Sequence, residues 1–326
     1  MDNKITKKRL SEFLSYEWIM MIIISVVAII VWELIFTMTS VRLTVGQQFK
    51  YYYDQGIYSD TDASLYTLFP EYKTFSYDVL EINSESLNED YNVLSARLSI
   101  QEGDVIITSG AEPKEEDKDK NVRVKGLVDG YKMYDYGRLL TDAEKYLAQF
   151  LKDGLTAETA NVADSNNLDT AKIESVFRER MKKDNRFRSE EQKKEGVKQE
   201  VERIFRLCEE VAKFRVLLSQ GDDYFYMYRR YEQIIELGNL SDSDKQGYEK
   251  YMDKEPLRYG LKVEKLIGDQ TKHSASEFFK LGGNDNAKDV VICVFDFLEY
   301  QPHLQFETIS FINTIVESCS NLYDGI

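Results

Sequence analysis

WIMMIIISVVAIIVWELIFTM runs from Trp18 to Met38 and is apolar except at Ser25, Glu33 and Thr37. An α-helix rises ~1.5 Å per residue, so about 20 residues cross the ~30 Å hydrocarbon core of a bilayer. A soluble helix of this length would carry a polar face, and none is present before Glu33. The stretch predicts one transmembrane helix over residues 18–38. A tail (1–17) precedes it and a short linker (39–46) follows.

The basic residues around the span predict its orientation. Lys4, Lys7, Lys8 and Arg9 lie before it, and the first basic residue after it is Arg42. Lys and Arg accumulate in short flanks on the cytoplasmic side. We therefore expect a single-pass protein of the cell membrane, with a cytoplasmic N-terminus and an extracellular C-terminal domain.

A cleaved signal peptide is the competing interpretation of the same stretch. Signal peptides have shorter apolar regions of ~7–15 residues and end in a small-x-small cleavage site. The exit sequence FTMTSVRLTVGQ offers no Ala-x-Ala, which favours an uncleaved anchor. Glu33 then lies near the outer interface, where it reaches the headgroups or contacts a polytopic membrane partner.

The composition of the remaining 285 or so residues excludes some classes of binding partner. The net charge is −15, which argues against nucleic acid and against adhesion to anionic lipid. The three cysteines, Cys208, Cys293 and Cys319, are too few for a disulfide framework and fit bacterial export. A pair between Cys293 and Cys319 remains open.

The first half of the exported part reads as an α/β unit. We expect strands at Gln47–Asp54 and Phe75–Ile82, a helix capped by Ser84, and a buried strand at Asp104–Thr108. Strand, helix and strand with short joints form a βαβ unit. A short helix at 62–68, a solvated loop at 110–125 and a helix at Leu139–Leu151, capped by Thr141, complete this half.

The second half begins with helical patterns. After a polar linker (154–168), residues 169–237 are expected to form three helices: one before a break at 184–188, a long one capped by Ser189 and Gln192, and one over Asp222–Leu237. A weak strand follows at 259–266, then a short helix capped by Ser274 or Ser276. Asp289–Phe295 reads as a second buried strand of the same parallel type, and Pro302 opens a final helix.

Motifs for catalysis and for metal or cofactor binding are missing from the sequence. It contains no glycine-rich phosphate loop and no Gly-x-Ser-x-Gly elbow, and its only histidines, His273 and His303, are far apart. Gly283-Asn-Asp-Asn lacks the spacing and the terminal Glu of a calcium loop. We therefore expect no enzyme, no metal and no cofactor.

The order of elements resembles that of the extracellular solute-binding proteins of bacterial ABC importers. The resemblance rests on Gln47–Asp54, Phe75–Ile82, the helix from Ser84 and Asp104–Thr108, and on the segment Tyr136–Leu147 (YGRLLTDAEKYL). Tyr259-Gly-Leu, Asp289–Phe295 and the closing helix fit its end. It implies an α/β domain like the periplasmic binding proteins, with a parallel-type sheet. The first lobe would comprise 47–153 and 256–326, and a largely helical second lobe or insert would comprise 154–255.

The resemblance also implies capture of a small solute, such as a sugar, for a membrane permease. Ligand would then lie at the carboxyl ends of the strands, against Tyr51, Tyr52, Tyr53, Thr108 and Ser109. Two features depart from the family: the retained helical anchor and a second lobe without strands of its own.

Three functions follow from these observations. The first is a membrane-anchored accessory or receptor of an ABC importer. The second is a non-catalytic scaffold that docks a membrane partner through its helical insert. The third is an extracellular sensor, which would need a partner chain because its tail is short.

Overall fold

The computed structural model describes residues 7–39, 48–54, 56–58, 81–87, 91–100, 102–112, 122–156, 160–237, 240–281, 287–296 and 306–325. They belong to two compact units, Met1–Thr44 and Val45–Ile326. The helix expected at 62–68, the first part of the strand expected at 75–82, the linker from residue 40, and Pro302 lie outside the described residues.

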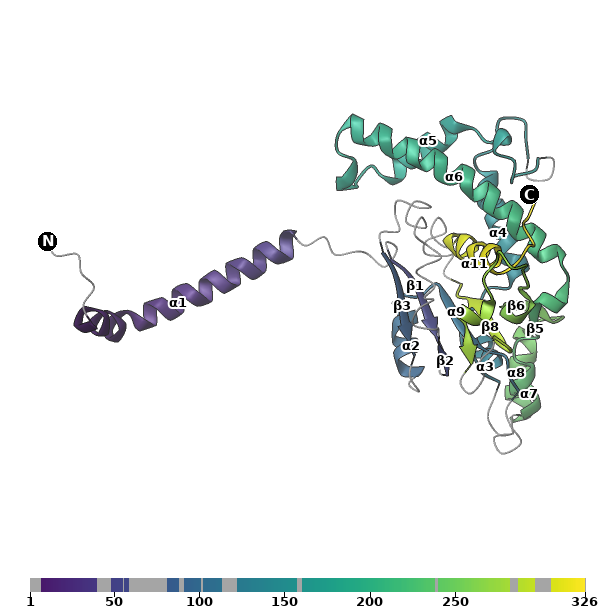
Figure 1. Cartoon of the computed structure of the whole chain (residues 1–326), viewed down its shortest axis with the longest axis horizontal. Helices are drawn as coiled ribbons and strands as arrows, with labels where there is room; N and C mark the ends of the chain where they lie inside the picture. Colours follow the sequence, from purple (N-terminus) through teal and green to yellow (C-terminus); the bar gives the residue numbers. More distant parts are fainter. Residues whose placement is uncertain are drawn as a thin grey trace. The chain divides into compact units, whose positions relative to one another are not determined.

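The first unit contains one long helix, α1 (Lys7–Thr39; Figure 1). Its segment Trp18–Phe36 has a mean hydropathy of 2.8, and none of it is buried within the protein. The apolar helix is therefore confirmed at the expected place. A helix with these properties is found both in single membrane anchors and in signal sequences.

The second unit is built on a six-stranded sheet in the order β3-β1-β4-β8-β6-β5. Its strands are β1 (Gln48–Tyr53), β3 (Glu81–Ser86), β4 (Val105–Ser109), β5 (Phe225–Tyr228), β6 (Leu257–Lys262) and β8 (Val290–Val294). β3, β1 and β4 pair in parallel, whereas β8 is antiparallel to both β4 and β6, and β5 is antiparallel to β6. Four strands thus run in one direction and two in the other. The α/β class is confirmed, with a mixed sheet.

The second buried strand was expected to be of parallel type, and this is wrong. β8 runs antiparallel to β4, with Ile107 opposite Ile292. The residues of both strands are buried throughout, as predicted. A continuous apolar run indicates that both faces of a strand are buried, but it does not indicate the direction of the strand.

The βαβ unit forms with shifted boundaries. β3 continues to Ser86, and α2 (Tyr91–Ser99) follows, so Ser84 is a strand residue and not a helix cap. β3 and β4 lie on opposite sides of β1. The chain therefore moves one way from β1 to β3 and then crosses β1 to reach β4, which makes the β1–β4 boundary the topological switch point of the sheet.

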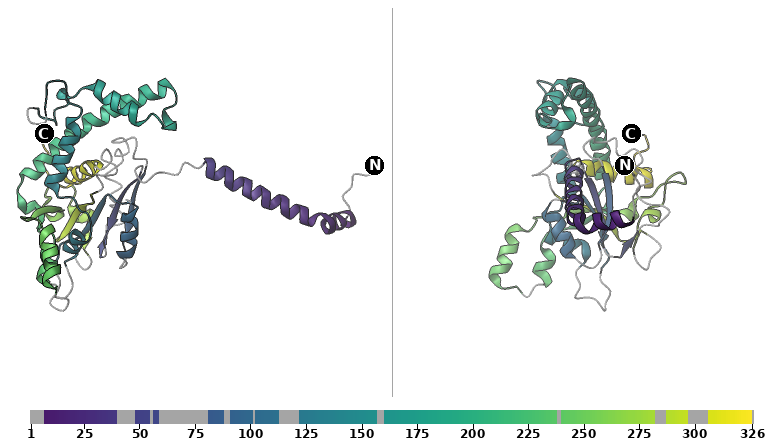
Figure 2. Two further views of the ribbon diagram at one scale, coloured as in Figure 1. Left: turned by 180° about the vertical axis from the view of Figure 1, so that it is seen from behind. Right: turned by 90° about the vertical axis from the view of Figure 1, so that its left-hand side faces the viewer.

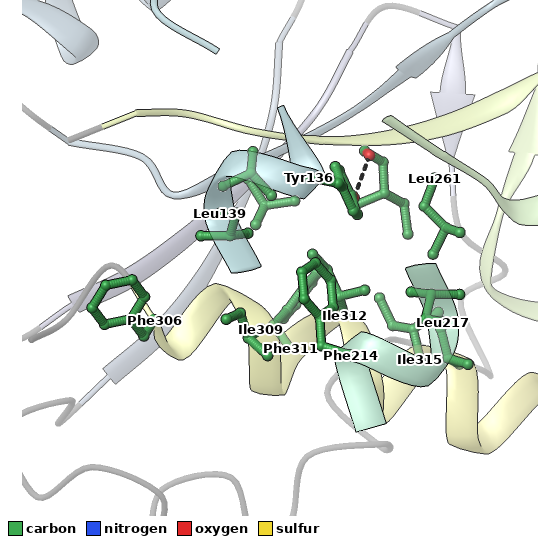
Figure 3. Close-up of a cluster of buried hydrophobic side chains, with 14 of the residues drawn as sticks. Tyr136, Leu139, Phe214, Leu217, Leu261, Phe306, Ile309, Phe311, Ile312 and Ile315 are labelled. Atoms are coloured by element: carbon green, nitrogen blue, oxygen red, sulfur yellow. Dashed lines mark hydrogen bonds between the residues drawn. The ribbon is translucent and has the colours of Figure 1, made fainter. Parts of the chain in front are cut away.

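One face of the sheet holds the main core, which is covered by α4 (Tyr136–Ala148), α6 (Glu190–Ser219) and α11 (Glu307–Cys319). Figure 3 shows Phe214 and Leu217 of α6 beside Ile309, Ile312 and Ile315 of α11. The buried Tyr136 hydroxyl donates to the Ile292 carbonyl at 2.8 Å. Each buried Ile or Leu contributes ~1.5–3 kcal/mol by removal from water. The predicted apolar stripe of the last helix is confirmed, with members Phe306, Ile309, Ile312, Val316 and Cys319.

The other face is covered by α2 and by α3 (Arg123–Gly130). Tyr52 and Ile106 point to this face, whereas their neighbours Tyr51 and Ile107 point to the main core. The loop expected at 110–125 is wrong at its end, because α3 begins at Arg123. Val124, Leu127 and Val128 of α3 are buried and explain why this charged run ends in a helix. Residues 113–121 lie outside the described part.

α4 begins earlier than expected because Asp135, not Thr141, caps it. The Asp135 carboxylate accepts from the Arg138 backbone N–H at 2.7 Å. It also accepts from the Arg258 N–H of β6 at 3.0 Å, so the cap ties the helix to the sheet. The Thr141 hydroxyl donates to the Gly137 carbonyl inside the helix.

α5 (Thr170–Arg180), the short helix η6 (Asn185–Phe187) and α6 form a hairpin. The capping box of Ser189 and Gln192 is confirmed. α5 and the first half of α6 lie side by side in every view (Figures 1 and 2). The 30 residues of α6 span about 45 Å, and its second half packs in the main core.

The third helix expected over Asp222–Leu237 is wrong. Residues 225–228 form β5 at the edge of the sheet, and α7 (Glu232–Leu237) is short. Phe225 faces the main core and Tyr228 the other face, which is the two-residue period of a strand. The segment expected to be helical throughout therefore contributes a strand to the common sheet. α8 (Asp242–Tyr251) follows α7.

Smaller elements complete the unit. α9 (Ala275–Phe278) begins at a capping box of Ser274 and Glu277, one of the two expected alternatives. β2 (Ile57–Tyr58) and β7 (Lys280–Leu281) form a separate antiparallel pair. All three cysteines are free and buried, so Cys293 and Cys319 do not pair.

Candidate functional site

The switch point carries a polar cluster, which we call the switch-point cluster: Asp54, Thr108 and Arg123. Asp54 directly follows β1, Thr108 lies near the end of β4, and Arg123 begins α3. The carboxyl ends of parallel strands meet at one edge of a sheet, and open α/β sheets bind ligands there. Side chains from three elements thus meet where such a fold places its site.

Asp54 is the centre of this cluster. Its side chain is 1% exposed, and its carboxylate accepts from the Thr108 hydroxyl at 2.7 Å. Arg123 adds two bonds, from Nη2 at 2.6 Å and from Nε at 3.1 Å. A carboxylate out of water is tolerated only when it is paired and hydrogen-bonded, and Arg123 with Thr108 meets both needs.

The backbone of Asp54 is also fixed. Its N–H donates to the Ile107 carbonyl of β4 at 2.9 Å, and its carbonyl accepts from the Ile57 N–H at 3.0 Å. The carboxylate is therefore held on a rigid support at the end of the strand. Arg123 reaches it from outside, with 30% of its side chain exposed. The buried carboxylate therefore sets the orientation of a partly exposed guanidinium, which is the group that binds anions most specifically.

A second charged network lies at the opposite end of the same face of β1. Lys50 Nζ contacts Glu85 at 2.8 Å and Glu102 at 2.9 Å, and Arg97 contacts Glu102 at 2.8 Å. Burial raises the pKa of Glu102, but Lys50 and Arg97 outweigh it, so the pKa ends below its usual value. The pairs join β1, β3 and α2, so we assign Lys50, Glu85, Arg97 and Glu102 a structural role.

The predicted tyrosines do not converge on one site. Tyr51 is 1% exposed and packs on Phe311 with ring centroids 5.3 Å apart. Tyr53 lies against Tyr51 on the same face. Tyr52 is on the other face, where its hydroxyl donates to the Glu102 carbonyl at 3.1 Å. Burial raises its pKa, so the group is a neutral donor.

The other predicted residues lie at the switch point or in the first unit. Thr108 belongs to the cluster, and the Ser109 hydroxyl next to it accepts from the Ala111 N–H at 3.1 Å. Glu33 lies in the apolar segment of α1 with its side chain exposed. The sequence patterns did not indicate Asp54 or Arg123 as site residues. The signal for Asp54 was its position, an acidic residue directly after a predicted aromatic strand.

A pocket of about 390 Å³ lies elsewhere, at the start of α9. Its lining includes Asp269, Lys272, His273 and Ser274 but no member of the switch-point cluster. His273 Nδ1 is 2.9 Å from Glu277, whose other oxygen accepts from the Ser274 N–H in the capping box. The Ser274 hydroxyl accepts from the Ser276 N–H. These groups therefore cap a helix and do not form a nucleophile and base.

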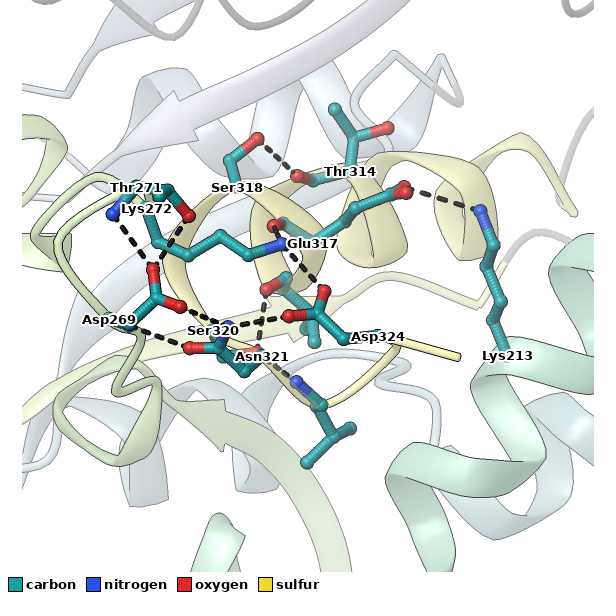
Figure 4. Close-up of polar contacts among 12 residues, drawn as sticks. Lys213, Asp269, Thr271, Lys272, Thr314, Glu317, Ser318, Ser320, Asn321 and Asp324 are labelled. Atoms are coloured by element: carbon teal, nitrogen blue, oxygen red, sulfur yellow. Dashed lines mark hydrogen bonds and ion pairs between the residues drawn. The ribbon is translucent and has the colours of Figure 1, made fainter. Parts of the chain in front are cut away.

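The side chain of Lys272, which lines the pocket, belongs to a polar network near the C-terminus (Figure 4). Lys272 donates to Asp324 at 2.9 Å and to the Glu317 carbonyl at 3.1 Å. Hydrogen bonds from Thr271 and Asn321 lower the pKa of Asp269. The network holds the C-terminal segment against the loop before α9, so we assign it a structural role.

Comparison with known proteins adds no relative. No family model, no curated protein and no solved structure matches the chain. Among the described residues, no group of three or more His, Cys, Asp or Glu could hold a metal ion. The candidate site therefore rests on geometry alone, with the switch-point cluster as its centre.

Proposed function

We propose that the chain is a membrane-anchored accessory protein that holds an extracellular α/β domain, resembling solute-binding proteins, beside a membrane permease of the ABC importer type. The observation that carries the proposal is an apolar helix, Trp18–Phe36, of which nothing is buried within the protein, on a chain whose residues 45–326 form a separate compact unit. An anchor keeps such a domain within reach of proteins in the same membrane.

Two features favour docking over solute capture. Tyr51 and Tyr52 are core residues on opposite faces of the sheet, so they offer no common ligand surface. The segment that would form a second lobe contributes β5 to the same sheet and packs α6 in its main core. A non-catalytic role in holding or assembling a transporter needs neither a cleft nor reacting groups.

Purification of the full chain from native membranes in mild detergent tests this proposal. We expect a polytopic permease to be recovered in stoichiometric amount. Glu33→Leu is the variant of choice within the span, and Ser25→Leu is its matched control. Loss of the permease in the Glu33 variant alone would place the contact in the membrane. Equal recovery in both would place it in the extracellular domain, and recovery of no permease would overturn the proposal.

A solute receptor is the second candidate, and the switch-point cluster favours it. Asp54 and Arg123 form an oriented ion pair where open α/β sheets bind ligands. A ligand that binds only the folded state raises its melting temperature with concentration. Thermal-shift measurements of the full chain against sugars, peptides and amino acids should then show a shift that Arg123→Lys reduces. The absence of a shift with every solute would remove this candidate.

A further inference from the structure

The tip of the α5–α6 hairpin is basic, although the protein as a whole is acidic. Residues 178–188, which we call the basic tip, contain six Lys or Arg and two Asp or Glu, whereas the whole chain carries −15. Extending the segment to Glu200 gives nine basic and six acidic residues, so the first turns of α6 do not cancel the excess. The basic tip is therefore locally positive, although the chain as a whole is negative.

The basic tip is held in shape by packing of its own. The rings of Phe177 and Phe187 meet edge to face at 5.2 Å, and both lie against Gly196 of α6. Arg186 lies over the Phe187 ring at 5.6 Å and contacts Asp184 at 2.7 Å. The loop between the helices is therefore an ordered surface and not a flexible basic tail.

The packing leaves lysines of the tip in water. The side chain of Lys182 is 71% exposed and that of Lys183 is also exposed. The Lys182 ammonium lies 3.7 Å from Glu179, itself 79% exposed, and pairs as exposed as this one contribute little. Both lysines are thus available to a larger anionic surface.

The turn of the hairpin lies away from the contact of α6 with α4, although Arg180 reaches back to Glu200 at 3.2 Å. The first contact of α6 with α4 among its described hydrogen bonds is from Arg203 to the Tyr146 hydroxyl, at 2.9 Å. Residues 190–199 precede that point and span ~15 Å of helix. The Debye length at physiological ionic strength is ~8 Å, so charges beyond that contact are largely screened at the exposed lysines of the turn, Lys182 and Lys183. A surface that meets Lys182 and Lys183 is therefore closer to their positive charge than to the charges beyond that contact.

We propose that the basic tip binds the anionic phosphate headgroups of the bilayer in which α1 is anchored. Clustered lysines and arginines on an ordered surface are what an anionic bilayer attracts. The inference rests on the membrane anchoring stated under Proposed function, but not on a permease. It revises the expectation from composition that anionic lipid is excluded, because that expectation used the charge of the whole chain.

The experiment uses the full chain in nanodiscs of zwitterionic lipid, mixed with vesicles and separated by flotation. We expect capture by vesicles of phosphatidylglycerol and phosphatidylcholine in equal parts, and none by phosphatidylcholine alone. The double variant K182E/K183E should weaken capture by roughly tenfold or more. The matched control is K245E/K254E, since Lys245 and Lys254 are exposed lysines outside the tip. It should leave capture unchanged.

Each other outcome overturns the proposal. Equal capture by both kinds of vesicle, equal loss in both double variants, or capture that survives ~1 M salt would exclude an electrostatic headgroup site at the tip. Competition by inorganic phosphate as strong as by anionic vesicles would indicate a small-anion site. Recovery of a permease is measured separately, so failure here and failure of the accessory role remain distinguishable. Circular dichroism of each variant verifies folding.

Discussion

Arg123, at the start of α3, donates two hydrogen bonds to the carboxylate of Asp54, at the end of β1, at 2.6 and 3.1 Å. The two partners differ in their access to water. Asp54 has 1% of its side chain exposed and Arg123 has 30%. Replacing Arg123 therefore takes the charged partner from a buried carboxylate, whereas replacing Asp54 leaves a guanidinium that still reaches solvent.

This asymmetry predicts unequal effects of two substitutions. Arg123→Met should lower the free energy of unfolding by about 3 kcal/mol, because it removes both guanidinium hydrogen bonds from a carboxylate that stays buried. Asp54→Asn should cost only about 1–2 kcal/mol, because the amide still accepts from Thr108. Urea unfolding of the detergent-solubilised chain, followed by circular dichroism, measures both.

The double variant is the control for that prediction. If the pair acts as a unit, Asp54→Asn combined with Arg123→Met should cost clearly less than the sum of the single losses. Additive losses would mean that the two side chains stabilise the fold independently. The switch-point cluster would then not be a coupled site.

Two glycines in helices should respond to alanine with opposite signs. A Cβ on Gly196 would lie 2.5 Å from Phe187 and 2.6 Å from Phe177, so Gly196→Ala should destabilise by about 1–3 kcal/mol. Among the described residues, no atom outside its own helix backbone and chain neighbours lies within 4 Å of a Cβ on Gly247 of α8, so Gly247→Ala should stabilise by about 0.5–1 kcal/mol. The shift of the melting temperature in each variant gives the sign. A stabilising Gly196→Ala would contradict the aromatic packing of the tip.

Glu200 predicts an acid-sensitive contact at the base of the hairpin. Its side chain is 1% exposed; burial alone would raise its pKa, but Arg203 and Arg180 outweigh it and lower the pKa to about 2. A carboxyl whose pKa is lower in the folded state stabilises the fold at pH values above its unfolded pKa, about 4.5. This contribution is lost as the pH falls from 4.5 towards 2. Glu200→Gln should remove about 3 kcal/mol at pH 7 and flatten the fall in stability between pH 4.5 and 2.

Glu195→Gln is the matched control for Glu200. Glu195 lies five residues earlier in α6 with its side chain exposed, so its replacement should leave both the stability at pH 7 and the acid profile unchanged. Denaturant titrations at several pH values compare the two. A similar acid profile for both variants would show that the ion pair with Arg203 adds nothing to stability.

The spacing of apolar residues correctly predicted the elements with a continuous buried face. It did not predict elements whose position depends on strand pairing or on polar contacts. The strand at Val105–Ser109 and the stripe of α11 were predicted because burial imposes apolar residues at fixed spacing. β5 was missed because FYMY fits a helical stripe as well as a strand, and its place at the sheet edge depends on pairing with β6.

The sequence predicted the position of one member of the switch-point cluster and not of the other two. Thr108 was expected at the carboxyl end of a strand, and it does lie there. Arg123 was assigned to a loop because its neighbours are charged, and only the fold shows that it meets Asp54, 69 residues earlier. Long-range pairing of this kind leaves no trace in one sequence.

The fate of α1 separates an anchor from a signal sequence. We expect an intact chain of 38.0 kDa in the membrane fraction, because the segment after Phe36 offers no Ala-x-Ala cleavage site. Mass spectrometry of the purified protein measures the N-terminus, and alkaline carbonate washing tests whether the chain is embedded. The control replaces residues after the span with Ala-x-Ala and should release a shorter soluble domain. A wild-type chain that begins beyond Met38 and washes off the membrane would show that the helix is a signal sequence, and the accessory role would lose its basis.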